Sequence, residues 1–153
     1  MTDIVSAKVR SRMMSGIRGK DTKPEMIVRR GLHARGFRFR LHDKRLPGKP
    51  DLVLPKYRTV IFVHGCFWHR HDCKYFKWPA TRPEFWHNKI RGNVERDKKH
   101  IKELDALGWQ VLFVWECELK SKSPNDISGK LDLLAQEVTR HRLSGITRPG
   151  EQA

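Results

Sequence analysis

Residues 63–73, near the middle of the chain, hold an unusual concentration of metal-binding side chains. They contain two of the three cysteines, three histidines and two adjacent aromatic residues. The apolar run 60–63 leads into them, so a buried strand is predicted to end where this cluster begins. The third cysteine, Cys117, follows a second apolar run, 111–114. A fold that brings Cys117 back to the cluster is therefore the strongest constraint that the sequence places on this chain.

The chain is strongly basic. Its 153 residues include 32 Lys+Arg against 17 Asp+Glu, a formal net charge of +15. Such a balance is typical of proteins that bind a polyanion, most often nucleic acid, with a basic protein lacking such a partner as the alternative. No apolar run approaches the ~20 residues of a membrane span, and the N-terminus has no hydrophobic signal region. We expect a cytoplasmic protein whose cysteines bind metal rather than form disulfides.

Three regions are predicted along the chain: a basic arm over 1–20, one globular domain over 21–142 and a C-terminal tail over 143–153. The arm carries five cations around the adjacent methionines Met13 and Met14. It is either a frayed terminus or a segment that orders on a nucleic-acid backbone, with an apolar tip at the methionines.

The pattern of the remaining residues predicts an α/β domain. Apolar alternation and turn signals mark strands, and a 3.6-residue periodicity marks helices. The strand–helix–strand unit within 59–115 should have parallel strands, which puts Cys66 and Cys117 at the same edge of the sheet. In chain order, the predicted elements are a helix over 22–35, strands over 37–41, 51–54 and 59–63, a helix over 83–107, a strand over 110–115 and a helix over 125–141.

Three carboxylates are candidates for a catalytic site. Asp51 opens an apolar strand, where a carboxylate needs a partner such as a metal ion. Asp97 falls inside the apolar stripe of the long helix and should meet a cation or a donor, with a structural ion pair or a cap as the alternative. Glu25 lies about 60° from the buried face of the first helix, and capping together with Thr22 alone can explain it.

Cys66, Cys73 and Cys117 supply three of the four ligands that tetrahedral zinc requires. Ordinary buried thiols are the alternative. A histidine that is left free on a zinc-stiffened loop is a good general base or acid. At this level the fourth ligand stays open among four neighbours: His64, His69, His71 and Asp72.

Aromatic side chains surround this loop. Phe67 and Trp68 are adjacent, so both cannot point into the core. On a chain with this charge, a projecting ring suggests a wedge between stacked bases, with core packing as the alternative. Trp86, Lys89 and Asn93 lie on one face of the long helix together with Arg96 and His100, which suits a binding surface.

At these residues the chain resembles the very-short-patch-repair (Vsr) endonucleases, over about Ala7 to Leu119. The resemblance implies a restriction-endonuclease-like fold, in which helices flank a mixed β-sheet, with a structural zinc site. It implies a DNA repair hydrolase that nicks double-stranded DNA on the 5′ side of the thymine in a T·G mismatch left by deamination of 5-methylcytosine, with two Mg²⁺ ions and one Zn²⁺. The matching segments are 46–51, 64–69, 79–82, 84–86, 93–97 and 115–117.

The resemblance also implies roles for single residues. Asp51 would bridge the magnesium ions, with the backbone carbonyl of Val63 as a further ligand. His69 would activate the attacking water and Asp97 would orient His69. The residues that would hold metal-bound waters are Glu25 and His64. The zinc ligands would be Cys66, His71, Cys73 and Cys117. The DNA contacts would be Met14 from the minor groove, Phe67, Trp68 and Trp86 beside the mismatch, and further candidates at Lys89 and Asn93.

The chain departs from the broader restriction-enzyme pattern at one point. That pattern has Glu-x-Lys on the strand after Asp51, whereas this strand reads Ile61-Phe62-Val63, a gap that Vsr proteins share. Two alternatives to the mismatch nuclease are a zinc-stabilised DNA-binding module without catalysis and a related nuclease with a different lesion preference. A single asymmetric nick requires only a monomer, and mismatch-repair proteins are candidate partners. Action on DNA in the nucleoid is expected.

Overall fold

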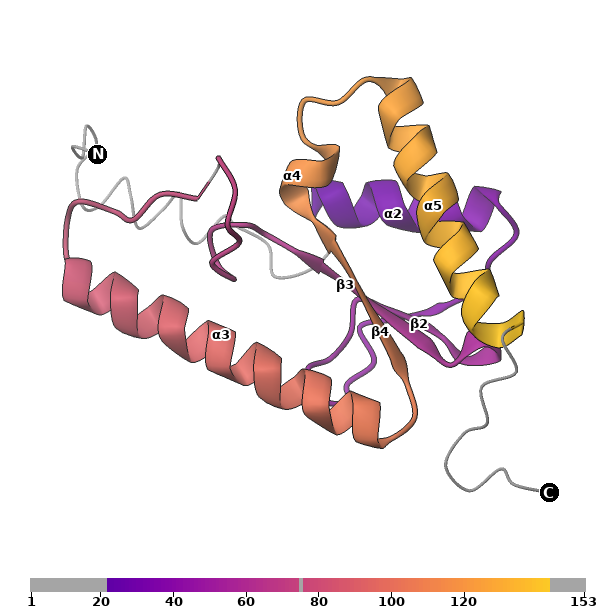
Figure 1. Cartoon of the computed structure of the whole chain (residues 1–153), viewed down its shortest axis with the longest axis horizontal. Coiled ribbons are helices and arrows are strands. Elements are labelled where there is room, and N and C mark those ends of the chain that lie inside the picture. Colours follow the sequence, from indigo (N-terminus) through magenta and orange to yellow (C-terminus); the bar gives the residue numbers. More distant parts are fainter. Residues whose placement is uncertain (1–21, 75, 144–153) are drawn as a thin grey trace.

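The computed structural model describes residues 22–74 and 76–143, and it shows a mixed sheet with helices on both faces (Figure 1). The predicted basic arm with Met14, and the predicted tail beyond residue 143, lie outside the described residues. Within those residues, no helix combines the length and the apolar character needed to cross a bilayer.

The sheet has four strands in the order β1-β2-β3-β4. β1 (Arg40–Leu41), β2 (Leu52–Leu54) and β3 (Thr59–His64) are antiparallel neighbours. β4 (Gln110–Trp115) runs parallel to β3, with Thr59 opposite Gln110 and His64 opposite Trp115. The predicted parallel βαβ unit is confirmed.

The predicted strand over 37–41 is wrong in extent, because only Arg40 and Leu41 pair with β2. β2 is three residues long, and the chain turns into the 3₁₀ helix η1 (Pro55–Tyr57) directly after it. In this register Phe39 lies opposite Leu54, the last residue of β2, so residues 37–38 have no strand to pair with. Phe37 is buried against the Tyr57 ring instead, with ring centroids 5.3 Å apart.

The helices follow the predicted periodicity. α2 (Lys23–Ala34) begins after Thr22, whose side chain accepts the Glu25 N–H at 3.4 Å, and Gly36 follows its end at a φ of 92°. α3 (Pro83–Ala106) and α5 (Pro124–Leu143) match the two later predictions within a few residues. The short helix α4 (Glu116–Leu119), which carries Cys117, was not predicted.

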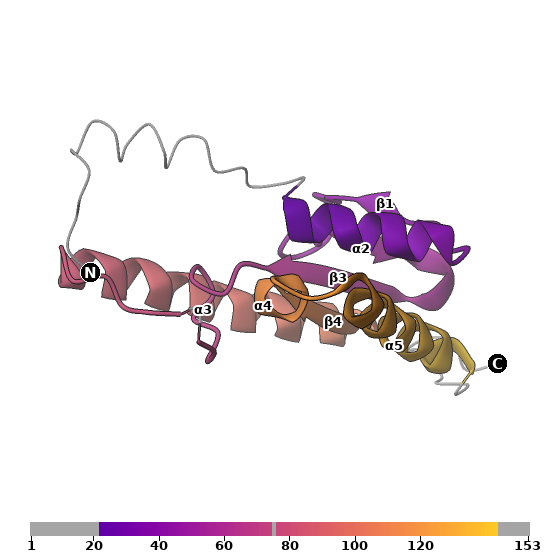
Figure 2. The ribbon, with the colours of Figure 1, turned by 90° about the horizontal axis from the view of Figure 1, so that it is seen from above.

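The two faces of the sheet bury different helices: Figure 1 shows α2 and α5 on one side of the strands and α3 on the other, and Figure 2 views the molecule from above. One core joins residues of α2 and α5 to the side chains of Leu52, Leu54 and Ile61. The other face carries Val53, Val60 and Phe62 and packs on Leu104 of α3. Alternate strand residues thus point to opposite layers. The loop between β3 and α3 lies at the end of the sheet where β3 and β4 both terminate, so it faces α4 and the start of α3.

Candidate active site

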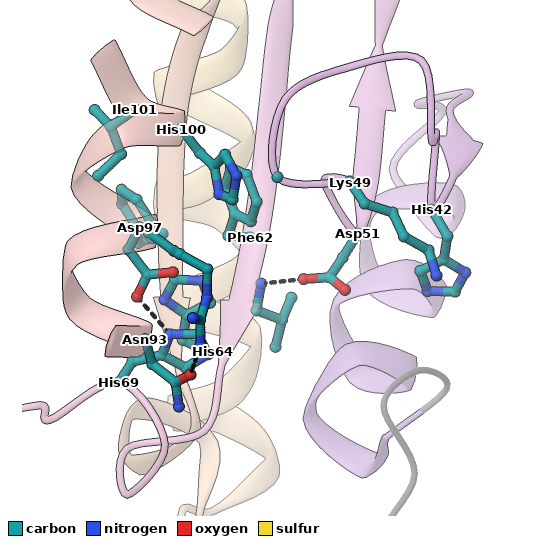
Figure 3. Close-up of a pocket in the computed structure, with 14 residues that line it drawn as sticks. His42, Lys49, Asp51, Phe62, His64, His69, Asn93, Asp97, His100 and Ile101 are labelled. Carbon is teal, nitrogen blue, oxygen red and sulfur yellow. Dashed lines mark hydrogen bonds and ion pairs between the residues drawn. The ribbon is translucent and has the colours of Figure 1, made fainter. Parts of the chain in front are cut away.

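A cavity of about 300 Å³ lies between the end of β3, the helix α3 and the loop that precedes β2. Asp51, His64, His69 and Asp97 all line it, although they come from four different parts of the chain. Figure 3 shows Asp51 on one wall of this cavity, with His64, His69 and Asp97 on the opposite side of β3. The structure therefore brings four of the five predicted catalytic residues to one cavity, and Glu25 is the one that does not line it.

Asp51 lies directly before β2 and is held by the neighbouring strand. Its Oδ2 accepts the backbone N–H of Val63 at 2.7 Å. Burial, and to a smaller extent the nearby charge of Glu25, raises the pKa of the Asp51 carboxyl to about 6. The carbonyl of a strand residue points to the same side as its N–H, so the Val63 carbonyl also faces Asp51. This pair of oxygen donors suits a hard cation such as Mg²⁺.

His69 and Asp97 form a short polar contact in the cavity. His69 Nδ1 and Asp97 Oδ2 lie 2.5 Å apart. A carboxylate only accepts, so Nδ1 carries the proton and the other ring nitrogen, Nε2, is left as an acceptor. Both side chains are 24% exposed, which leaves them in reach of a substrate. Asp97 thus has the partner that its place on the apolar stripe requires.

His64 stacks on His69 with ring centroids 3.6 Å apart and planes at 3°. Burial, followed by the charge of His69, lowers the pKa of His64 to about 3, so this ring is neutral at physiological pH. Its buried Nδ1 has no hydrogen-bond partner among residues 22–74 and 76–143. A buried nitrogen without a hydrogen-bond partner fits a site that binds water or an ion.

Glu25 on α2 is only 2% exposed and does not line the cavity, although its partner His42 does. Its Oε2 accepts from His42 Nε2 at 2.9 Å and from Arg29 at 3.3 Å. Ligand atoms of Glu25, His42 and Asp51 lie within 4.8 Å of one another. Thr22 caps α2 through the backbone N–H of Glu25, so the Glu25 carboxylate makes its contacts with His42 and Arg29 instead.

The cysteines gather as the βαβ geometry predicts. Ligand atoms of Cys66, His71, Cys73 and Cys117 lie within 4.8 Å of one another. The Cys117 Sγ and His71 Nδ1 are 3.4 Å apart. Tetrahedral zinc with the usual Zn–S and Zn–N lengths separates such atoms by about 3.5 Å. The four donors therefore fit Zn²⁺, with His71 as the fourth.

Two further features favour a cation at this cluster. Burial raises the pKa of the Cys66 thiol to about 12 when no ion is present, and a bound zinc ion reverses that effect by stabilising the thiolate. The His71 ring stacks on Trp115 at 4.1 Å, with planes at 7°, which fixes its orientation. His64 and His69 lie in a separate group with Asp97.

Phe67, Trp68 and Trp86 form one aromatic cluster beside the cavity. The ring of Phe67 lies 5.1 Å from Trp68 and 5.3 Å from Trp86, and all three residues are half-buried. They are neither core residues nor freely projecting. Asn93 supports them, because its Nδ2 donates to the Trp68 carbonyl at 3.0 Å. Lys89 is exposed on α3.

Several residues that line the cavity were not predicted: His42, Lys49, Arg96 and His100. His42 and Lys49 belong to a loop with no periodic pattern, and both have a positive φ, 47° and 50°. Arg96 and His100 lie on the same face of α3 as Asn93. For that face the sequence predicted a general binding surface and no place in the cavity.

Comparison with known proteins gives a consistent set of matches. A family model described as DNA mismatch endonuclease Vsr matches residues 2–75. The type II nicking enzyme V.NmeAIP of Neisseria meningitidis serogroup A is 51% identical over 123 residues, 80% of this chain and 88% of that protein. The DNA mismatch endonuclease Vsr of Escherichia coli K12 is 50% identical over 122 residues, 80% of this chain and 78% of that protein. The type II nicking enzyme V.XorIIP of Xanthomonas oryzae pv. oryzae is 50% identical over 119 residues, 78% of this chain and 88% of that protein.

Proposed function

Because the chain belongs to the Vsr family of DNA mismatch endonucleases, we propose that it nicks double-stranded DNA at T·G mismatches. The nick lies on the 5′ side of the thymine, and the mismatch arises when 5-methylcytosine is deaminated. One observation carries the proposal: His69, paired with Asp97 at 2.5 Å, lines the same cavity as the buried carboxylate of Asp51. A DNA-binding module without catalysis has no need of this arrangement.

In the proposed reaction, His69 is the general base. Its Nε2 takes a proton from the attacking water, and Asp97 stabilises the imidazolium that results. The water oxygen then bonds to phosphorus as the bond to the leaving oxygen breaks. His64 lies against His69 as a neutral ring, so it adds no positive charge that would oppose this protonation.

The oxygen donors of Asp51 and the Val63 carbonyl would hold Mg²⁺, and we propose two ions, with Glu25 and His64 orienting water around them. When bound, these ions stabilise negative charge on the phosphoryl and leaving oxygens. A zinc ion at the Cys66, His71, Cys73 and Cys117 cluster would have all four positions filled by protein. Such a closed site is structural. It would hold rigid the loop that carries His69.

The aromatic cluster supports a route to selectivity. Three aromatic residues would insert beside the mismatched pair from the major groove: Phe67, Trp68 and Trp86. Met14 would enter from the minor groove, and Lys89 and Asn93 would contact the bases. Insertion requires unstacking, and a T·G pair opens more cheaply than a matched pair. The net charge of +15 supplies affinity for the DNA backbone. We propose a monomer that acts on nucleoid DNA in the cytoplasm, with mismatch-repair proteins as partners.

The test is a nicking assay with Mg²⁺ on three duplexes that differ only at one pair: T·G, T·A and C·G. We expect a single nick 5′ of the thymine in the T·G duplex and none in the other two. Tight binding without a nick would favour a DNA-binding module. Equal cleavage of all three duplexes would indicate a nuclease with a different preference.

A further inference from the structure

The catalytic cavity contains a lysine that has no role in the account above. Lys49 lies two residues before Asp51 and lines the cavity together with Asp51, His69 and Asp97. In Figure 3 its side chain comes from the same wall as Asp51 and His42. The residue is exposed, and its side chain makes no hydrogen bond or ion pair within residues 22–74 and 76–143.

The other positively charged or titratable groups of the cavity are largely engaged. Arg96 donates to the Asn93 side chain. His42 is paired with Glu25, and His69 is paired with Asp97. Of the two permanent cations that line the cavity in the described part of the chain, Arg96 bonds to an uncharged amide and Lys49 makes no side-chain hydrogen bond.

The backbone holds Lys49 in an unfavourable conformation. Its φ is 50°, a left-handed value that favours glycine, and the residue precedes Pro50, where extended conformations with negative φ are normal. Such a position is energetically unfavourable and persists only where the surroundings impose it. Strain of this kind concentrates at functional sites, which points to a functional role for the Lys49 side chain.

Contacts on both sides of Lys49 impose this conformation. The Lys49 N–H donates to the Leu46 carbonyl at 3.1 Å, and Pro50 is buried. Gly48, at a φ of 76°, lies against α3 so closely that a Cβ there would be 3.0 Å from the His100 Cβ. The loop is thus fixed against α3, and Lys49 is presented at the edge of the cavity by a rigid segment.

We propose that Lys49 is a catalytic residue whose ammonium group binds a non-bridging oxygen of the scissile phosphate. The inference rests on the proposed nuclease function and deepens it. Strand β3 offers only uncharged side chains to the cavity, those of Phe62, Val63 and the neutral His64. Lys49 supplies a cation instead, from the wall that also holds Asp51 and His42. It stays protonated throughout, and it stabilises the charge that the phosphoryl oxygens gain while His69 removes the proton from water.

The experiment measures single-turnover nicking of the T·G duplex with Mg²⁺ by the full chain at saturating enzyme, together with duplex affinity and melting temperature. Lys49→Met should slow the nicking step by about 100-fold, the usual effect of removing one donor to transition-state charge. Its duplex affinity should change by less than about threefold, because the contact strengthens in the transition state. Lys49→Arg should recover at least about tenfold of the lost rate, since it restores the charge.

Two variants separate catalysis from a structural role. Lys49→Gly should slow nicking as much as Lys49→Met while keeping or raising the melting temperature, because glycine adopts the left-handed φ without strain. Lys44→Met is the matched control: Lys44 is exposed on the same loop but does not line the cavity, so its rate should equal that of the wild type.

The outcomes are distinct. If the wild type nicks the duplex and both Lys49→Met and Lys49→Gly nick it at the wild-type rate, this inference is wrong and the proposed function stands. If Lys49→Met is slow only because the duplex affinity or the melting temperature has fallen, Lys49 is a binding or structural residue and not a catalytic one. If the wild type does not nick the T·G duplex, the proposed function and this inference fail together.

Discussion

The cysteine–histidine cluster and the catalytic cavity share one loop, yet they are built in opposite ways. The cluster takes three of its four donors from residues 66–73 and completes the set with Cys117. Three of the donors are soft thiol groups and the fourth is an imidazole, and all four lie within 4.8 Å of one another. The cavity instead draws oxygen and imidazole groups from the loop before β2, from β3, from the loop after β3 and from α3, and these groups surround about 300 Å³ of open space. A closed set of ligands suits a structural ion, and an open set suits chemistry.

The position of His69 connects the two regions. It lies between Cys66 and His71 in the chain, while its ring faces Asp97 and the cavity. A metal at the cluster would therefore fix the backbone of the general base without touching the substrate. If the regions have separate roles, a change in the cavity should abolish activity and preserve zinc. A change in the cluster should first release zinc, and activity should fall only as a consequence.

The largest effect is expected from Asp51→Asn. Nicking should fall by on the order of 10⁴-fold, about 5 kcal/mol in the barrier, because the carboxylate is the main candidate ligand for the catalytic metals. Asparagine still accepts the Val63 N–H, so the fold should survive. Single-turnover kinetics and metal analysis of the same preparation check the prediction. Loss of bound zinc in this variant would break the separation between the two regions.

The same variant should be more stable than the wild type without Mg²⁺. Burial raises the pKa of Asp51 from 3.8 to about 6. The stability that this group contributes is therefore full below pH 3.8 and is lost as the pH rises through 6. At pH 8 the ionised carboxylate destabilises the magnesium-free protein by up to about 3 kcal/mol, and asparagine removes this penalty. Urea unfolding at pH 8 and pH 4 measures it, and an advantage that does not shrink at pH 4 would contradict this cause.

Asp97→Asn should slow nicking by about 10²–10³-fold, because His69 would lose the partner that orients it and stabilises its protonated form. Its zinc content should equal that of the wild type. A slower rate accompanied by a lower melting temperature or by lost zinc would mean that Asp97 acts on the structure and not on the base.

Cys117→Ser tests the cysteine–histidine cluster, as Asp51→Asn tests the cavity. The variant should lose its zinc and at least about 3 kcal/mol of unfolding free energy, because metal binding contributes directly to folding. Activity should fall as a consequence, through the loosened loop around His69. Zinc analysis and urea unfolding check this, with Asp51→Asn as the control that keeps its metal. A serine variant with full zinc content would remove Cys117 from the ligand set.

The cluster was more predictable from the sequence than the cavity, and the reason is geometric. Parallel strands in a βαβ unit end at the same edge of a sheet, so the spacing of Cys66 and Cys117 already implied that they meet. Asp97 was likewise placed by helical periodicity, which fixes the face on which a residue lies.

The parts that sequence reasoning missed belong to segments without a period. His42 and Lys49 lie on a loop whose side-chain directions are set by tertiary contacts, such as that of Gly48 with His100. The strand β1 was overestimated for a related reason. Alternation shows that a segment is half-buried, but the length of a strand depends on how far its partner extends, and β2 ends after Leu54.

The smallest predicted effect concerns acid stability and the neutral ring of His64. This ring is buried against Phe62 and Phe113, with centroids 5.5 Å and 5.1 Å away. Its pKa is lowered to about 3, so its contribution to stability is full above pH 6.5 and is lost as the pH falls. Between pH 7 and pH 5 the wild type should lose about 2 kcal/mol through this group alone.

Removing the imidazole should remove that loss. In His64→Gln the decline in unfolding free energy from pH 7 to pH 5 should be smaller by about 2 kcal/mol than in the wild type, measured by urea unfolding without Mg²⁺. His33→Gln, at an exposed histidine of α2, is the control and should leave the decline unchanged. Zinc should be measured at both pH values, because protonation of the cluster also releases metal in acid. An unchanged decline in His64→Gln with zinc retained would assign the acid sensitivity to the cluster instead of the cavity.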